Sequence, residues 1–523
     1  MSAENPSAPA PATTTIDPDE LNAPFSLAVG NNIILTLQSD ALYINGAQSC
    51  SYMLPVDSTF ADSNCGAFLD PRPRKNVRYC GLQVVDSTAS QSIPFYNILA
   101  ADVSESALSI RYAKPLVKDD YTSSTLTFAL DSQAFAKAEP WVEQLLKLAY
   151  GDAQRNKRLK VLINPHGGKG YAEDLYTEYA APMFEAAGCK VDLEMSKYAG
   201  HAADIAEKLD IDAYDVLICC SGDGLPYEVL NGFAKRENAA EALTKVAVAM
   251  IPCGSGNAMA WNLFGTNSIS LSALTVIKGL RTPLDLVSIT QRGTRTLSFL
   301  SQSYGIVAES DLGTDNLRWM GAARFTYGFL VRLLRQATYP CDVAFKLETD
   351  SKQEIKERYV AYKKKKSSLR PIGGGEQVGK GLPPLKYGTD EDDVPSDWQQ
   401  LSTDTLANFY AGNMAIMTAD ANFFPSTVPN DGTIDIVMID ANVGRLRTLS
   451  MMTAVENGEF FDYPEVEVRK VTGYRLSPRG SKDGYISVDG ERIPFEPFQV
   501  EVHQGLGTVL SKSGHLYEAQ GPI

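Results

Sequence analysis

The sequence has few of the residues that build metal centres and disulfide scaffolds. Its 523 residues include four histidines and eight cysteines. The cysteines are scattered, with no C-x-x-C pair and no Cys/His spacing of a zinc site. One adjacent pair, Cys219-Cys220, falls inside an apolar segment. This pattern favours a reducing cytosol and argues against a disulfide-stapled domain.

Long apolar runs and an excess of positive charge are also missing. No uninterrupted apolar run reaches about 18 residues, and no basic start leads into an apolar segment, so neither a membrane span nor a secretory signal is predicted. The 63 acidic residues outnumber the 48 basic ones, for a net charge of −15. This balance argues against nucleic acid or an anionic membrane as a partner of the whole protein. We expect a cytoplasmic protein, soluble or peripherally associated with membranes.

The first third of the chain predicts a small β-domain. At roughly 100–200 residues per domain, the length predicts two to four domains. Residues 1–24 are rich in Pro, Ala, Ser and Thr and predict a disordered N-terminus. Residues 25–151 show short β-like runs between turns and end in an amphipathic helix that carries Trp141. Strands followed by one such helix resemble the pleckstrin-homology (PH) plan, and another small β-domain is the alternative.

The rest of the chain divides into an α/β part and a β-rich part. Over residues 157–284, apolar strands alternate with helical segments, which predicts a parallel sheet. Residues 285–515 predict a mostly antiparallel β-domain, interrupted by a basic and apolar helix at 319–336. Residues 363–400 read as a disordered insertion. Its lysine run, Lys363–Lys366, is either a solvated charge block or a contact for anionic lipid.

Three glycine-rich turns follow predicted strands of the α/β part. They read NPHGGKG at 164–170, SGDG at 221–224 and PCGSGN at 252–257. The first is not a Walker A loop, because no Ser or Thr follows Lys169. Bare backbone N–H groups can nevertheless approach a phosphate at such turns. One turn alone is ordinary, and Asp223 on the second could simply cap the following helix. Three turns on one rim of a sheet predict a nucleotide phosphate site.

These motifs, in this order, resemble the catalytic domain shared by diacylglycerol, ceramide and sphingosine kinases. The resemblance covers residues 158–512 and is closest to sphingoid long-chain-base (sphingosine) kinases. The block from Ser301 to Gly328, SQSYGIVAESDLGTDNLRWMGAARFTYG, and the late VDGE at 488–491 carry this closer likeness. The family implies an α/β ATP-binding domain, a lipid-binding β-domain, and ATP with Mg²⁺ as cofactors.

The resemblance assigns roles to individual positions. It makes Asp223 the general base that accepts the proton of the substrate hydroxyl. Arg318 and Arg324 match two arginines that clamp the β- and γ-phosphates, a geometry suited to the guanidinium fork, although bare sequence would leave them as surface arginines. Direct metal ligands stay unknown. The positions that match nucleotide-binding residues of the family are Asn164, Gly167, Gly168, Lys169, Ser196, Ser221, Gly222, Gly224, Glu228, Gly254, Ser255, Asn257, Arg318, Arg324, Asp489, Gly490 and Glu491.

Substrate choice is expected to rest on Asp311. This residue matches the acid that holds the amine of sphingosine, and Ser301 matches a hydroxyl that binds the same head group. Ceramide and diacylglycerol carry no such positive charge. The alternative is that Asp311 caps a helix beginning near Thr314. Glu309 stands where the family usually has Asp, and this departure conserves the charge.

The predicted function is an ATP-dependent lipid kinase. It would phosphorylate the primary hydroxyl of sphingosine, dihydrosphingosine or phytosphingosine, with the lipid tail near Phe325, Leu330 and Met414. Ceramide kinase and diacylglycerol kinase are the enzyme alternatives, whereas the GGKG and GSGN loops fit NAD kinase and phosphofructokinase poorly. A lipid-binding scaffold on an inactive kinase fold is the other class. The presence of Asp223 and Lys169, with both arginines, argues against inactivity.

Overall fold

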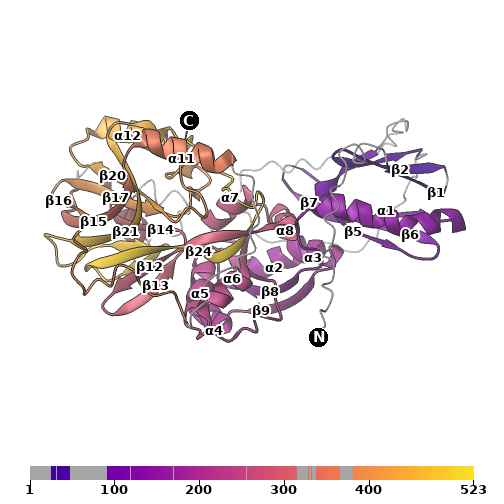
Figure 1. Ribbon diagram of the computed structural model, residues 1–523, viewed down its shortest axis with the longest axis horizontal. Helices are drawn as coiled ribbons and strands as arrows, with labels where there is room; N and C mark the ends of the chain where they lie inside the picture. The colour runs from indigo at the N-terminus through magenta and orange to yellow at the C-terminus, as the bar shows by residue number, and fades with distance from the viewer. Residues whose placement is uncertain are drawn as a thin grey trace, which may run out of the picture. The chain divides into compact units, whose positions relative to one another are not determined.

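The computed structural model describes most of the chain. The described residues are 25–30, 32–46, 91–117, 119–168, 170–254, 256–314, 328, 331–332, 337–364 and 381–522. The chain forms two units (Figure 1): Met1–Ile110 with Thr125–Ala149, and Arg111–Ser124 with Tyr150–Ile523.

The first unit contains two small sheets and one long helix. Its buried Trp141 on the helix donates its indole N–H to the carbonyl of Phe25 over 3.3 Å, which fixes the helix to the first strand. The strands and the closing helix follow the predicted order. One of the β-like runs, GLQVV at 81–85, lies outside the described residues. The PH-like plan itself stays a prediction. The elements are β1 (Phe25–Val29), β2 (Ile33–Gln38), β3 (Ala41–Asn45), β4 (Gln91–Pro94), η1 (Phe95–Asn97), β5 (Ile98–Val103), β6 (Ala107–Pro115), β7 (Tyr121–Ala129) and α1 (Ser132–Tyr150).

The second unit begins with the predicted parallel sheet. Its strands lie in the order β9 (Lys190–Met195), β8 (Arg158–Ile163), β10 (Val216–Ser221) and β11 (Ala247–Pro252), and all are parallel. β10 and β11 are buried along their whole length, as expected for strands covered on both faces. The helices are α2 (Ala172–Leu175), the π-helical turn η2 (Tyr176–Ala180), α3 (Ala181–Ala186), α4 (His201–Lys208), α5 (Gly224–Ala234), α6 (Ala239–Lys245), α7 (Ala258–Phe264) and α8 (Ile269–Lys278).

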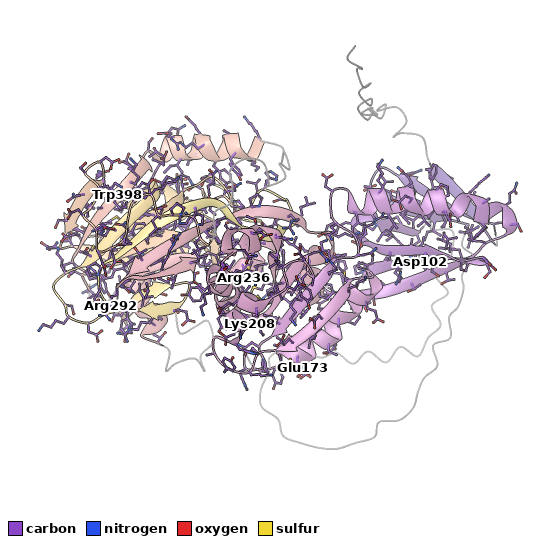
Figure 2. All side chains as sticks on the ribbon, turned by 60° about the horizontal axis from the view of Figure 1, so that its bottom comes forward. Asp102, Glu173, Lys208, Arg236, Arg292 and Trp398 are labelled. Carbon is purple, nitrogen blue, oxygen red and sulfur yellow. The ribbon has the colours of Figure 1, made fainter. Side chains whose placement is uncertain are left out.

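Arg236 shows how a loop of this part is fixed. It follows α5, and Figure 2 labels it. Its guanidinium donates to the carbonyl groups of Ala206, Glu207 and Leu209. These carbonyls lie at the carboxyl end of α4, where a helix leaves such groups without partners and favours a positive charge. The side chain therefore joins the carboxyl end of α4 to the segment that follows α5.

The remaining strands form the predicted antiparallel part. They are β12 (Leu280–Gln291), β13 (Thr294–Ser298), β14 (Ser301–Gly305), β15 (Cys341–Thr349), β16 (Gln399–Thr403), β17 (Leu406–Gly412), β18 (Ile416–Thr418), β19 (Ala421–Asn422), β20 (Ile434–Asp440), β21 (Val466–Pro478), β22 (Ile486–Val488), β23 (Glu491–Ile493) and β24 (Phe498–Ser511). Its helical elements are α9 (Ile306–Leu312), α11 (Lys352–Lys364), α12 (Arg445–Thr453) and η4 (Glu459–Asp462). Among the described helices of the chain, none combines the length and apolar character needed to cross a bilayer.

The parallel and antiparallel parts share one sheet. β24 pairs with β11 in parallel, where Val509 lies opposite Val248, and with β12 in antiparallel fashion from Leu280 onward. β24 also pairs with β21. The boundary expected at 284/285 therefore falls inside β12, and the two parts form a continuous layer. The residue pattern changes near Leu284, but the backbone hydrogen bonds between β12 and β24 continue on both sides of it.

Two apolar clusters cover the two faces of the antiparallel part. Adjacent residues of β17 divide between them, as the two-residue period of a strand requires: Phe409 joins one cluster and Tyr410 the other. The second cluster lies beneath α11, α12 and η4, and we name it the helix-covered cluster. Its buried members are Ile355, Tyr410, Phe424, Val437, Ile439, Met451, Ala454, Val455, Phe460, Phe461, Val466 and Val468.

Residues 381–398 are ordered, in contrast to the expectation for the insertion 363–400. Buried Glu501 accepts hydrogen bonds from the backbone N–H of Lys386 and of Tyr387 over 2.8–3.0 Å. Trp398, labelled in Figure 2, is 4% exposed and meets the ring of Tyr387 edge-on. β16 begins directly after it, and Lys363 belongs to α11. Polar composition predicted disorder here. Buried polar side chains of the sheet instead hold this backbone, and the prediction is wrong for these residues.

Replacing Glu501 tests this account of the 381–398 segment. Glu501→Ala leaves the N–H groups of Lys386 and Tyr387 without their acceptor, so we expect a stability loss of about 2–4 kcal/mol. The segment should also be cleaved faster in limited proteolysis. Glu467→Ala on the exposed side of β21 is the matched control. Equal cleavage rates in both variants would show that the carboxylate does not hold the segment.

Candidate active site

The three glycine turns meet at the carboxyl ends of neighbouring strands. They follow β8, β10 and β11. A Cβ atom on Gly168 would collide with the carbonyl oxygen of Cys253, and one on Gly254 would lie 2.7 Å from the backbone N of Gly222. Gly168 also has a φ of +60°, a backbone conformation that is unfavourable for residues with a Cβ atom. Glycine is required because the turns pack backbone against backbone, and the expectation that they share one rim is confirmed.

Asp223 holds two of these turns together. Its Oδ2 accepts the N–H of Ala258 and its Oδ1 that of Met259, each over 2.9 Å. Both donors belong to the start of α7, the helix after the third turn. The side chain makes no cap hydrogen bond to α5, its own following helix, so the simple capping alternative is wrong. Burial raises the pKa of Asp223 above its ordinary value, and backbone N–H donors, Met259 first, oppose that rise.

Two asparagines shape the first and third turns, because their side-chain amides bond to backbone groups of the turn that carries them. Asn257, with a φ of +56°, accepts the N–H of Gly254 and donates to its carbonyl, each over 3.0 Å. Asn164 accepts the N–H of His166 over 3.0 Å. Both amides therefore fix loop shape. The two amides thereby position the backbone of the first and third turns.

The other residues expected at the nucleotide differ in burial and in hydrogen-bond partners, and some lie outside the described residues. The carboxylate of Glu228 accepts the N–H of Ala202 over 3.2 Å and joins α5 to α4. Ser196 is half-buried, and its N–H donates to the carbonyl of Ile163. Ser221 is buried at the end of β10. Gly167 packs against Ser221, because a Cβ on it would lie 2.8 Å from the Ser221 hydroxyl oxygen. Six expected residues, two of them tail positions, lie outside the described residues: Lys169, Ser255, Arg318, Arg324, Phe325 and Leu330.

The carboxylate of Asp489 organises the turn between β13 and β14. It is 4% exposed and accepts four hydrogen bonds of 2.6–3.1 Å, from the hydroxyl of Ser298 and from the N–H groups of Phe299, Leu300 and Ser301. Burial raises the pKa of the Asp489 carboxyl to about 6, although these hydrogen bonds act to lower it. The sequence assigned this residue to the nucleotide. In the structure its carboxylate accepts hydrogen bonds from the backbone beside Ser301, and the nucleotide assignment stays a prediction.

The late turn at 488–491 also approaches the second glycine turn. Glu491 is exposed, and its Oε1 lies 3.9 Å from where a Cβ on Gly224 would stand. Tyr227 on α5 is close enough to be influenced by this turn: burial raises its pKa to about 12, and the charges of Asp489 and Glu491 add to the rise. Gly490 has a φ of +87° with open space around its Cβ position. The turn thus lies between Gly224 of the second glycine turn and Ser301.

Tyr410 connects the two residues expected at the substrate head group. Its side chain is hydrogen bonded to that of Ser301. Burial, and then the charges of Asp311 and Asp489, raise the pKa of Tyr410. Tyr410 is also a member of the helix-covered cluster. Sequence reasoning missed this residue, because LANFYAG is an ordinary apolar strand and nothing in it singles out one hydroxyl.

Helix α9 carries Asp311 and its neighbour Glu309. Asp311 lies within α9 and is half-buried. Glu309 pairs with Arg332, Oε1 to Nε over 3.3 Å, and accepts a hydrogen bond from the hydroxyl of Tyr339. Glu309, which stands where the family usually has Asp, thus forms an ion pair with Arg332. Met414, the described tail position, is fully buried.

Three family models match successive parts of the chain. The diacylglycerol kinase catalytic domain matches residues 158–289, and the YegS C-terminal NAD kinase beta sandwich-like domain matches residues 301–511. A domain of unknown function matches residues 25–151. The first match holds all three glycine turns and Asp223, and the second holds Ser301, Asp311 and the late turn.

Curated relatives decide the family. Sphingoid long chain base kinase 5 of Saccharomyces cerevisiae is 36% identical over 71% of this chain, which spans 62% of that relative's length. Sphingoid long chain base kinase 4 of Schizosaccharomyces pombe is 34% identical over 83% of this chain and 90% of its own length. The chain belongs to the sphingoid long-chain-base kinase family. Human sphingosine kinase 1 is 30% identical over 68% of this chain and 90% of its own.

Among solved structures, a diacylglycerol kinase from Bacillus anthracis str. Sterne resembles this kinase. The alignment covers 68% of this chain and 97% of the other, at 17% identity and a TM-score of 0.45.

The raised pKa of Asp489 predicts a specific pH dependence of stability. The folded state takes up a proton between about pH 4 and pH 6, because Asp489 protonates near pH 6 when folded and near pH 4 when unfolded. Its stabilising contribution is therefore complete below pH 4 and is lost as the pH rises through 6, by roughly 3 kcal/mol. Asp489→Asn cannot titrate. Denaturant unfolding should show wild type losing this stability relative to the variant from pH 4 to pH 6, whereas a constant difference would disprove the shift.

Proposed function

We propose that the protein transfers the γ-phosphate of ATP to the primary hydroxyl of a sphingoid long-chain base. The observation that carries this proposal is the placement of Asp223. Its carboxylate is fixed by two N–H donors at the point where the glycine turns meet. Membership of the long-chain-base kinase family supports the substrate class.

Asp223 has the setting of a general base. Phosphoryl transfer needs little covalent chemistry from the protein and depends on positioning and charge stabilisation. Asp223 would accept the hydroxyl proton as the substrate oxygen attacks phosphorus. A carboxylate with a raised pKa is a better proton acceptor than an ordinary one, provided that it is ionised at the working pH. The bare glycines on either side leave room for the hydroxyl to approach.

The phosphates would lie along the glycine turns. Backbone N–H groups of turns without side chains can reach phosphate oxygens closely. Lys169, Arg318 and Arg324 would add positive charge, as the family resemblance implies. Mg²⁺ would be carried mainly by the phosphates themselves, as is usual for this ion, and the exposed carboxylate of Glu491 lies close to Gly224. When bound, the ion would neutralise charge that develops on the transferred group.

The head group would bind where Ser301, Tyr410 and Asp311 lie together. A protonated amine needs a carboxylate, and Asp311 would supply it. Hydroxyl groups of Ser301 and Tyr410 would bind the polar end of the base. Since Tyr410 also belongs to the helix-covered cluster, the tail would run along the apolar residues at that end of the cluster.

An isosteric change tests the base. Asp223→Asn retains one oxygen for the α7 donors, so we expect a folded protein that binds ATP but turns over about 10²–10⁴-fold more slowly. Radiolabelled phosphate transfer from Mg·ATP to sphingosine measures turnover, and ATP titration by calorimetry checks the site. Near-wild-type turnover would exclude Asp223 as the base. ATP binding without transfer in the wild type would favour an inactive scaffold.

A substrate panel tests the amine contact. Asp311→Ala removes a charge-assisted hydrogen bond worth about 1.5–3 kcal/mol, which corresponds to roughly a 10- to 100-fold lower kcat/KM for sphingosine. Sphingosine, ceramide and diacylglycerol would be compared side by side in mixed micelles, with Asp311→Asn as the variant of matched size. Ceramide labelling that does not change in Asp311→Ala would identify a ceramide kinase and leave Asp311 a structural role.

A further inference from the structure

Helix α12 presents apolar side chains to solvent. Leu446 is 85% exposed and Leu449 is 42% exposed. Residues three apart lie on the same side of a helix, so the two leucines form one face. The opposite side of α12 is buried through Thr448 and Met451, and Met451 joins the helix-covered cluster. The helix is therefore apolar both inward and outward, which ordinary surface helices are not.

Helix α11 continues the same outer surface. It buries Ile355 and Tyr359 inward and leaves Val360 44% exposed. Residues between the two helices join them. Lys352 of α11 donates to the carbonyl of Tyr463 over 2.7 Å, and the guanidinium of Arg447 on α12 stacks 4.5 Å from the ring of that tyrosine. Both helices cover the same cluster, and Figure 1 shows them along one side of the antiparallel part.

The two helices are basic in a strongly acidic chain. α11 carries five basic and two acidic residues, and α12 two basic and none acidic, whereas the whole chain has a net charge of −15. Neighbouring acids offset part of this charge, since Asp462 pairs with Lys356 and Glu465 with Arg447. The exposed Lys363 and Lys364 close α11.

We propose that the outer face of α11 and α12 docks on the surface of an anionic lipid bilayer. The docking face consists of Leu446, Leu449, Val360, Lys363 and Lys364. The exposed leucines lie on α12 and the exposed lysines at the end of α11. Apolar side chains combined with basic residues on surface helices are the pattern of an interfacial membrane anchor. The inference rests on the proposed function, because a lipid substrate resides in a bilayer. The helix-covered cluster lies directly beneath α12, so docking here brings the bilayer to the outer side of the apolar residues assigned to the tail.

A bilayer fits this face better than a second copy of the chain. Three separate apolar side chains offer far less than the roughly 800 Å² per partner that a stable protein interface buries. A bilayer needs no shape complementarity, and individual leucines can enter the interface between head groups and acyl chains.

Vesicle flotation without ATP or substrate tests the proposal directly. The full-length protein is mixed with vesicles of phosphatidylcholine, or of phosphatidylcholine containing phosphatidylserine. We expect wild type to float with the anionic vesicles, and the double variant Leu446→Ser/Leu449→Ser to bind at least about tenfold more weakly. Lys363→Glu/Lys364→Glu should lose only the part of binding that depends on phosphatidylserine. All variants should unfold at the wild-type temperature, because the changed side chains are exposed.

A matched control uses another exposed apolar pair. Leu116 and Val117 follow β6 and are 57% and 81% exposed, and Leu116→Ser/Val117→Ser should float like wild type. Wild type that does not float overturns the proposal. The proposal is also overturned if the Leu446→Ser/Leu449→Ser variant floats like wild type, or if the Leu116→Ser/Val117→Ser control loses binding. Loss of a concentration-dependent dimer in the leucine variant, with flotation intact, would assign the face to self-association.

This experiment is independent of the proposed activity. Phosphate transfer to sphingosine in detergent micelles should be equal in wild type and the leucine variant, whereas transfer to sphingosine presented in anionic vesicles should fall with flotation. An inactive wild type that still floats would refute the proposed function and leave the docking face intact.

Discussion

The pairing of β24 with its neighbours is the constraint on which the rest of the second unit depends. β24 bonds to β11 of the parallel part and to β12 and β21 of the antiparallel part. Its register is fixed near Asp285, which is fully buried and accepts the N–H groups of Gly432 and Gly505 beside a bulge in β12. Because strands in one sheet cannot slide past each other without losing a whole ladder of hydrogen bonds, the glycine turns and the strand that carries Ser301 are held in one frame.

Within this frame, carboxylates that are buried or half-buried bind backbone N–H groups that regular secondary structure leaves without partners. Asp223 accepts backbone N–H groups of α7, Asp489 those of the turn before Ser301, and Glu501 those of the 381–398 segment. Charge-assisted hydrogen bonds to backbone are stronger than neutral ones, and a buried carboxylate without donors would be very costly. Each acid therefore fixes an irregular loop exactly where regular hydrogen bonding stops. One of these acids, Asp223, is also the proposed general base.

The sequence was most informative where local chemistry leaves few choices. Apolar strands alternating with helices predicted the parallel sheet, and the glycine turns could be placed on one rim because the carboxyl ends of parallel strands meet there. It was least informative where the partner is distant. Tyr410 lies about a hundred residues from Ser301 in the chain, Glu501 lies beyond the segment it holds, and the position of Asp489 among four donors depends on a register between β14 and β22 that no local pattern encodes.

The amino-acid sequence by itself determined the family, the glycine turns and the identity of the candidate base, because these depend on short motifs whose residue types admit few substitutes. Only the tertiary structure decided what the carboxylates hold, that the two catalytic parts share one sheet, and which leucines face outward from α12. Those outcomes follow from strand register and from the burial of side chains by residues far away in the chain, and neither is a property of any single segment.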